Sequence, residues 1–119
     1  MKYMLLIYRD ETAMQRMSEQ AVSETTGAYL AYTKTIRDSG ILISGDRLGP
    51  SSAATTVRLT DGRSQVLNGP YAETREQLGG YYIIDVADLD AALSWAARCP
   101  GAQQGVVELR PIPADRTAG

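Results

Sequence analysis

The sequence predicts an α+β fold in which two helices cover one face of a mostly antiparallel sheet. Short segments rich in β-branched and aromatic residues alternate with two stretches of helical periodicity. Between these stretches lies Asp61-Gly62, a strong hairpin signal. The resulting order is β-α-β, a β-hairpin, then β-α-β, which is the order of a ferredoxin-like sandwich.

The first half of the chain predicts two strands joined by a long helix. Residues 2–8 are nearly continuously apolar, as in a strand covered on both faces. A helix follows from the N-cap Ser18 to about Ser39, and Gly40 provides the left-handed residue that ends it. Residues 41–48 form the second strand. The helix is expected to bury a stripe at spacings of three and four: Val22, Thr26, Tyr29, Thr33 and Ile36.

The second half begins with the hairpin, which pairs residues 54–59 with 64–67. Asn68-Gly69-Pro70 ends it, because proline cannot donate to a strand ladder. Gly79-Gly80 leads into a strand and not into a helix, so we expect a bulge or a close backbone approach there. The remaining elements are a strand at 81–86, a helix from the N-cap Asp88 to Pro100-Gly101, and a strand at 106–112.

Residues 1–113 are expected to form one domain, followed by a flexible tail at 114–119. The strands at 2–8, 79–86 and 105–112 are apolar at nearly every position, although a sheet with one solvated face needs apolar residues only at alternate positions. A second copy packed sheet to sheet would cover the face that the helices leave open. The sequence therefore predicts a homodimer.

Composition excludes several classes of partner. The chain has 12 basic and 14 acidic residues without a basic stripe, which argues against nucleic acid and against an anionic membrane surface. One cysteine, Cys99, and no histidine exclude an intrachain disulfide and the usual zinc patterns. No run approaches the ~18 apolar residues of a membrane span, and the opening segment lacks a signal-peptide pattern, so a cytoplasmic protein is expected.

Several segments together carry a family resemblance. They are residues 3–8, Thr56-Val57-Arg58 before Asp61-Gly62, the motif from Asn68 to Tyr82, Asp88-Leu89-Asp90-Ala91-Ala92-Leu93 with Trp95-Ala96, and Val107-Glu108-Leu109-Arg110-Pro111. In these segments the chain resembles the YCII-related family, in its DGPF-type branch. The Asp-Gly-Pro-Phe of that branch is replaced here by Asn68-Gly69-Pro70-Tyr71.

The resemblance implies a dimeric α+β barrel, in agreement with the expected sheet-to-sheet dimer, but it implies little about activity. Members of the wider superfamily are thought to use a His–Asp pair in the cleft. This sequence contains no histidine, so the pair cannot be carried over, and any acid–base chemistry needs another residue. No cofactor and no metal are expected.

The long motif supplies the first candidate site residues. The segment Asn68-Gly69-Pro70 could present backbone N–H groups to a ligand carboxylate, or it could be only a turn. Glu73 and Glu76 would lie on one side of a helical turn as paired carboxylates, or they could simply be solvated. Arg58 could clamp an anionic ligand. Alternatively, its guanidinium pairs across the hairpin with Asp61, Glu73 or Glu76.

Tyrosines supply the second group of candidates, because a buried tyrosine hydroxyl needs a partner and a cluster of them suggests a semi-polar cavity. The alternative role is packing in a dimer interface, where tyrosine is also enriched. Tyr81 and Tyr82 must point to opposite faces of their strand. Asp10, just after the first strand, is either a cap or a functional acid, and Cys99 is expected to be a core residue. The tyrosines are Tyr8, Tyr32, Tyr71, Tyr81 and Tyr82.

The sequence thus favours a small homodimer that binds a small, anionic organic molecule in a pocket between sheet and helix. The alternatives are an enzyme without cofactor, of lyase, isomerase or oxygenase type, and a regulatory module that binds another protein. In the enzyme, Asp10, Glu73 or Tyr71 would transfer protons. The expected ligand-binding residues are Arg58, Asn68, Gly69, Pro70, Tyr71, Glu73, Tyr8 and Tyr32.

Overall fold

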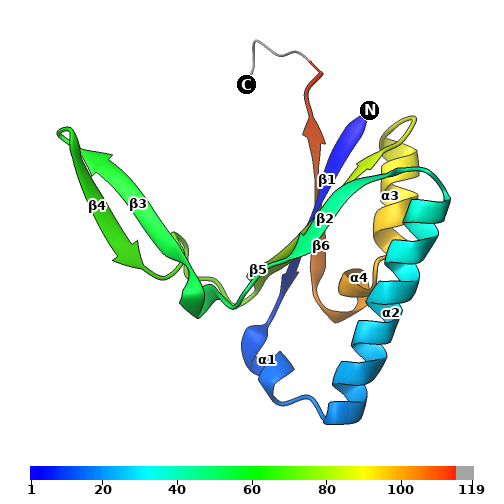
Figure 1. Ribbon diagram of the computed structural model, residues 1–119, viewed down its shortest axis with the longest axis horizontal. Helices are drawn as coiled ribbons and strands as arrows, with labels where there is room; N and C mark the ends of the chain where they lie inside the picture. The colour runs from blue at the N-terminus through cyan, green and yellow to red at the C-terminus, as the bar shows by residue number, and fades with distance from the viewer. Residues whose placement is uncertain (115–119) are drawn as a thin grey trace.

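The structure, a computed structural model, describes residues 1–114 (Figure 1). The tail expected at 114–119 therefore lies, from residue 115 onward, outside the described residues. The helices and strands are β1 (Lys2–Arg9), α1 (Glu11–Gln15), α2 (Glu19–Asp38), β2 (Leu42–Arg47), the 3₁₀ helix η1 (Ser51–Ala53), β3 (Thr55–Thr60), β4 (Arg63–Asn68), β5 (Gln77–Asp85), α3 (Leu89–Arg98), α4 (Pro100–Gln104) and β6 (Val106–Ile112).

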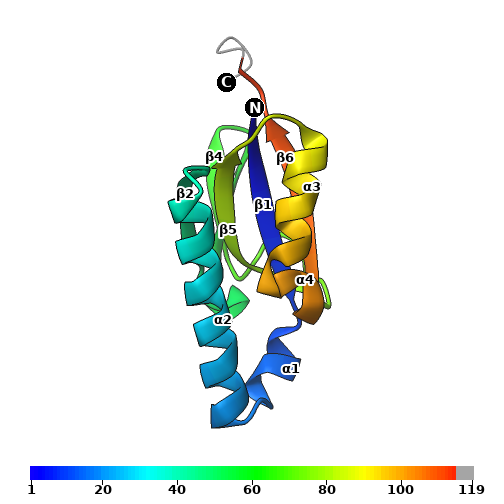
Figure 2. The same cartoon turned by 90° about the vertical axis from the view of Figure 1, so that its right-hand side faces the viewer.

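An antiparallel sheet with helices on one face forms the body of the molecule, which confirms the predicted mixed α+β class. Its four strands lie in the order β2-β5-β1-β6. Figure 2 shows α2 and α3 side by side in front of this sheet. The register sets Leu5 of β1 between Tyr82 of β5 and Leu109 of β6. The central strand β1 therefore has a partner on each side over most of its length.

The hydrophobic core fills the space between the sheet and the helices. Tyr3, Leu5 and Ile7 alternate with less buried residues along β1, because successive side chains of a strand point to opposite faces. Ile84 of β5 and Ile36 of α2 meet them and are completely buried. A fully buried side chain of this size contributes about 1.5–3 kcal/mol to folding. Cys99 is also completely buried, as predicted.

The two long helices begin where the sequence predicts. The Ser18 hydroxyl accepts a hydrogen bond from the amide of Ala21, and the Asp88 carboxylate accepts one from the amide of Ala91. The short helices α1 and α4 were not predicted. Pro100, expected to stop the second helix, also begins α4, because proline lacks the N–H that the first helical residue leaves unpaired.

The β3–β4 hairpin, residues 55–68, forms a separate two-stranded sheet that we call the arm. Its turn residues Asp61 and Gly62 both have positive φ values, 52° and 75°, as a tight two-residue hairpin turn requires. The arm projects from the body on the side of the sheet opposite the helices (Figures 1 and 2). The hairpin signal is confirmed, whereas the separation of the arm from the main sheet was not predicted.

Gly79-Gly80 behaves as the sequence predicts. Ile7 pairs with Gly80 and Tyr8 pairs with Leu78, so Gly79 is the extra residue of a β-bulge. A Cβ atom at Gly80 would lie 3.0 Å from the carbonyl oxygen of Asp46, so the glycine also permits a close approach of two backbones.

The face of the sheet away from the helices, which we call the open face, is apolar at its centre. Met4 and Leu6 of β1 lie beside Ile83 and Tyr81 of β5, and all four side chains remain partly exposed. Tyr8 lies on the same face. No helix within residues 1–114 is long and apolar enough to cross a membrane.

Candidate functional site

A cavity of about 400 Å³, the main cavity, lies between α2 and the helix-facing side of the sheet. Residues from α1, α2 and three strands surround it, so segments far apart in the sequence meet there. Its walls are Ile7, Arg9, Met14, Met17, Val22, Thr25, Thr26, Tyr29, Leu30, Thr33, Gly45, Asp46, Arg47, Gly79, Gly80, Tyr81 and Tyr82.

The cavity exists because the beginning of α2 lies over small residues of the sheet. Towards its C-terminus, α2 packs Ile36 into the core, whereas Val22 keeps 48% of its surface exposed. Gly45 and Gly80 place no side chains on the floor beneath. The predicted buried stripe of this helix is therefore wrong in part: of its members only Ile36 is buried, and the other four, Val22, Thr26, Tyr29 and Thr33, line the cavity.

Two arginines supply positive charge to the main cavity. Arg9 follows Ile7 at alternate positions of β1, and Arg47 pairs with Gly80 of β5, so both residues lie on the helix-facing side of the sheet. The Arg9 guanidinium carbon is 5.9 Å from the centre of the Tyr29 ring. Within residues 1–114, no carboxylate lies within 4.0 Å of either guanidinium. Asp46 also borders the cavity, but its carboxylate accepts a hydrogen bond from the Tyr81 hydroxyl at 3.1 Å and pairs with neither guanidinium.

Two tyrosines add neutral polar groups. The Tyr82 hydroxyl shares a hydrogen bond of 2.6 Å with the Thr33 hydroxyl. The Tyr29 hydroxyl is buried and has no hydrogen-bond partner among the described residues. Burial raises the pKa of Tyr82, and burial raises the pKa of Tyr29 to about 12. Both phenols are therefore neutral near pH 7 and can act as hydrogen-bond donors.

Tyr29→Phe is expected to leave stability at pH 7 unchanged or to raise it by up to about 1 kcal/mol, because an unpaired buried hydroxyl is costly. Tyr32→Phe is the matched control, since its hydroxyl donates to the Trp95 carbonyl at 2.7 Å. Losing that bond should cost about 1 kcal/mol. Urea unfolding of both variants tests this, and a clear loss of stability in Tyr29→Phe would contradict it.

The same hydroxyl predicts a dependence of stability on alkaline pH. The folded pKa of Tyr29, about 12, is above its unfolded value of 10.0, so the folded protein retains this proton longer. The stabilising effect is complete below pH 10.0 and is lost as the pH rises towards 12. The urea midpoint of the wild-type protein should fall across this range. It should fall less in Tyr29→Phe, and equal slopes for the two proteins would show that another group controls the effect.

None of the predicted ligand-binding residues lines the main cavity. Asn68, Gly69, Pro70 and Glu73 instead line a second, more open cavity of about 460 Å³ near the base of the arm. Gly69 donates its backbone N–H to the Ala54 carbonyl, so this amide is already used by the turn. This contact is one that the structural role of the turn requires.

The other predicted residues lie in three different places. Arg58 and Tyr71 lie together, with the guanidinium carbon 5.6 Å from the centre of the aromatic ring, and Tyr71 is 77% exposed. Tyr8 lies on the open face, where its hydroxyl donates to Glu108 at 3.1 Å. Tyr32 is a core residue. The structure therefore brings together two small groups of the predicted residues and separates these groups from Tyr8 and Tyr32.

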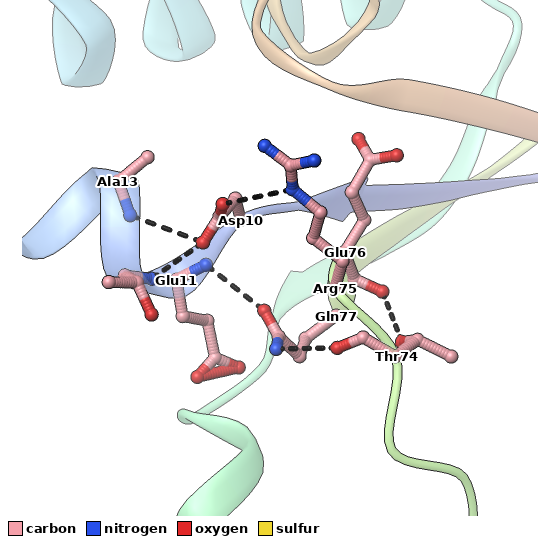
Figure 3. A network of polar contacts seen from close by, with 8 residues as sticks. Asp10, Glu11, Ala13, Thr74, Arg75, Glu76 and Gln77 are labelled. Carbon is pink, nitrogen blue, oxygen red and sulfur yellow. Dashed lines mark hydrogen bonds and ion pairs between the residues drawn. The ribbon is translucent and has the colours of Figure 1, made fainter.

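Asp10 belongs to a polar network that joins α1 to the segment before β5 (Figure 3). Its carboxylate accepts hydrogen bonds from the amides of Thr12 and Ala13, and it lies 3.9 Å from Nε of Arg75. The Gln77 side chain accepts a hydrogen bond from the amide of Glu11 at 3.0 Å. Asp10 is thus a helix cap, which was one of its two expected roles.

The predicted pairing of Glu73 and Glu76 required a helical turn. Residues 71–76 contain two bends and no helix, so the helical turn on which the pairing of the two carboxylates depended is absent. Within residues 1–114, no group of three or more His, Cys, Asp or Glu side chains is arranged to hold a metal ion.

Sequence reasoning missed the two arginines of the cavity. The signal was present in β1, where Tyr3, Leu5 and Ile7 form one face and Arg9 continues it. The position of Arg47 required the pairing of β2 with β5, which contains an irregularity between Leu42 and Ser44. No local pattern indicates that irregularity.

The fold and the cavity define a small α+β protein with a ligand-sized space between one helix and its sheet. The chain belongs to the YCII-related domain family, whose model matches residues 1–114. An uncharacterized protein of Rhizobium meliloti (strain 1021) is 37% identical over 114 residues, covering 94% of this chain and 92% of that protein.

The fold is also similar to that of a solved enzyme structure. This is 5-chloro-2-hydroxyhydroquinone dehydrochlorinase (TftG) from Burkholderia phenoliruptrix AC1100 in complex with 2,5-dihydroxybenzoquinone. The TM-score is 0.55 and the identity 12%, with 98% of each chain covered. At this identity the similarity concerns the fold alone.

Proposed function

We propose that this protein binds a small, planar organic anion in the main cavity. The observation that carries the proposal is the pair of arginines, Arg9 and Arg47, beside a largely apolar cavity without a competing carboxylate within 4.0 Å among the described residues. A ligand with one charged edge and an apolar body would satisfy both parts of this surface.

The dimensions of the cavity support a ligand of this size. Its volume of about 400 Å³ falls at the lower end of the range of about 300–1,000 Å³ for small-molecule sites. Met14, Met17 and Val22 provide apolar contacts, and methionine adapts well to flat rings of different shape. The Tyr82 and Thr33 hydroxyls would orient an oxygen of the ligand by hydrogen bonds.

The structural neighbour supports a hydroxylated quinone as the first probe. That enzyme was solved with 2,5-dihydroxybenzoquinone, a flat ring whose acidic hydroxyl groups become negatively charged in neutral solution. Such a ring matches the apolar walls and the two guanidinium groups proposed here as its binding site. The dehydrochlorinase resembles this chain in fold and not in sequence, so its ligand serves as a probe of the cavity.

Calorimetric titration with 2,5-dihydroxybenzoquinone tests the proposal. The wild-type protein should bind one molecule per chain, and Arg47→Ala should weaken binding by about tenfold to a hundredfold, the usual effect of losing a charged hydrogen bond. Arg58→Ala is the matched control, because Arg58 lies on the arm away from the cavity. Binding that depends on Arg58 and not on Arg47, or no binding at all, would contradict the proposal.

A second candidate function is an enzyme without cofactor, and the dehydrochlorinase activity of the structural neighbour favours it. In this case Tyr82, paired with Thr33, is the cavity group best placed to move a proton. The catalytic candidates Asp10, Glu73 and Tyr71 do not line the main cavity. Chloride release from 5-chloro-2-hydroxyhydroquinone, compared between wild-type and Tyr82→Phe, would distinguish catalysis from binding alone.

The proposal includes a cytoplasmic homodimer. The apolar open face supports a sheet-to-sheet dimer, and the strand order β2-β5-β1-β6 supports a ferredoxin-like protomer within a dimeric α+β barrel. The segment Asn68-Gly69-Pro70-Tyr71 supports placement in the DGPF-type branch. In this dimer the main cavity of each chain lies on the helix side of its sheet, away from the partner.

A further inference from the structure

The arm exposes an apolar surface that the described part of the chain, residues 1–114, leaves uncovered. Val57 of β3 pairs with Val66 of β4, and strand alternation places Leu59 on the same face. These three side chains are 61%, 60% and 69% exposed, respectively. An isolated two-stranded hairpin is only marginally stable in water, so an arm of this kind needs a surface to pack against.

The arm and the open face border the same space. In Figure 1 the arm leaves the body on the side away from α2 and α3, and in Figure 2 the hairpin lies behind the sheet while both helices lie in front. The open face, centred on Leu6 and Ile83, is directed to this side as well. A partner seated on the open face would therefore also be within reach of the arm.

The exposed area is large enough for an extensive interface. The structure has an accessible surface of 8431 Å², whereas a compact monomer of 12.9 kDa has about 6,300 Å². The excess is about 2,100 Å² per chain, or about 4,200 Å² for two chains, which falls within the 2,000–5,000 Å² in total that obligate dimers bury. The radius of gyration is 16.3 Å, while about 13.5 Å is expected for a compact chain of 119 residues.

We propose that the arm clasps a second copy of this chain, packing the face formed by Val57, Leu59 and Val66 against the protomer that covers its open face. The inference rests on the proposed homodimer. A second copy is the favoured occupant because each chain carries both apolar surfaces, the arm face and the open face. In a dimer with a two-fold axis, both surfaces of both protomers would be buried. The arm would supply contacts that flat sheet packing alone does not.

Isotope-filtered NOE spectroscopy on a mixture of labelled and unlabelled protein tests the clasp. Methyl groups of Val57, Leu59 and Val66 should show intermolecular NOEs in the same sample as those of Leu6 and Ile83. Intermolecular NOEs from Leu6 and Ile83 without any from the arm would overturn the clasp and keep the dimer. A monomeric wild-type protein would overturn both, whereas ligand binding in the main cavity is measured separately by titration.

Adjacent residues of β4 provide a matched pair of variants, because Val66 and Gln65 point to opposite faces of the arm. Val66→Asp should raise the dimer dissociation constant at least about 100-fold, since it places an unpaired charge in the contact. Gln65→Asp should change it by less than about threefold, as surface substitutions do. Analytical ultracentrifugation measures both dissociation constants. The proposal would be overturned if the two variants had equal effects or if Val66→Asp had none.

Discussion

Leu6→Asp is expected to convert the proposed homodimer into a folded monomer. Leu6 lies at the centre of the open face, between Tyr81 of β5 and Glu108 of β6. In a two-fold dimer the substitution buries two unpaired carboxylates, each costing at least about 3 kcal/mol, so the dissociation constant should rise roughly 10⁴-fold. Ultracentrifugation should then give the chain mass of 12.9 kDa, with an unchanged far-ultraviolet circular dichroism spectrum.

Two further variants show whether the effect belongs to the interface. Leu6→Met retains volume and hydrophobicity, and it should remain dimeric. Ile84→Asp places the same charge on the opposite face of the sheet, where Ile84 is completely buried under the helices, and it should unfold the protein. A Leu6→Asp protein with undiminished dimer mass would rule out the sheet-to-sheet geometry.

Gly105→Ala is expected to destabilise the protein by about 3 kcal/mol, the upper end of the usual cost of overpacking. A Cβ atom at Gly105 would lie 2.1 Å from the Tyr8 carbonyl oxygen and 3.1 Å from Cα of Arg9. Both contacts are with backbone, so β1 and the beginning of β6 must separate to admit the methyl group. The displacement would also move Arg9, and ligand binding in the main cavity should weaken together with stability.

Gly27→Ala is the matched control for this substitution. Gly27 lies within α2, and a Cβ atom there meets nothing within 4 Å. Alanine should raise stability by about 0.5–1 kcal/mol, because it restricts the unfolded chain and favours the helix. Urea unfolding at one fixed protein concentration compares the two variants, and a Gly105→Ala protein as stable as wild-type would contradict the expected steric clash.

The helix starts and the hairpin turn could be predicted from the sequence, because each depends on residues only a few positions apart. Ser18 and Asp88 begin helices through contacts with residues three positions later, and Asp61-Gly62 makes a tight turn without help from the rest of the chain. The long motif from Asn68 to Tyr82 was sufficient to indicate the family to which the chain belongs. The helix starts, the hairpin turn and the family motif each depend on residues that are close together in the sequence.

The candidate site was less accessible, because it depends on pairing between distant strands. The unusual composition of the motif around Asn68 predicted a binding site there. The motif instead lies at the base of the arm, apart from the main cavity. Arg9 and Arg47 meet beneath α2 only after β1, β5 and β2 pair in the observed register. The bulge at Gly79 changes that register by one residue, which is enough to reverse the face of a side chain.

The sequence by itself determined the α+β class, the family, the helix starts and the hairpin turn. The tertiary structure alone decided which face of α2 borders a cavity, where the charges of that cavity come from, and that the hairpin leaves the sheet as an arm. Periodicity shows which side chains share a face of α2, but it does not show how far each part of the helix lies from the sheet. The floor of the cavity is likewise a product of the tertiary structure, because Gly45 and Gly80 come from two strands that meet only when β2 pairs with β5.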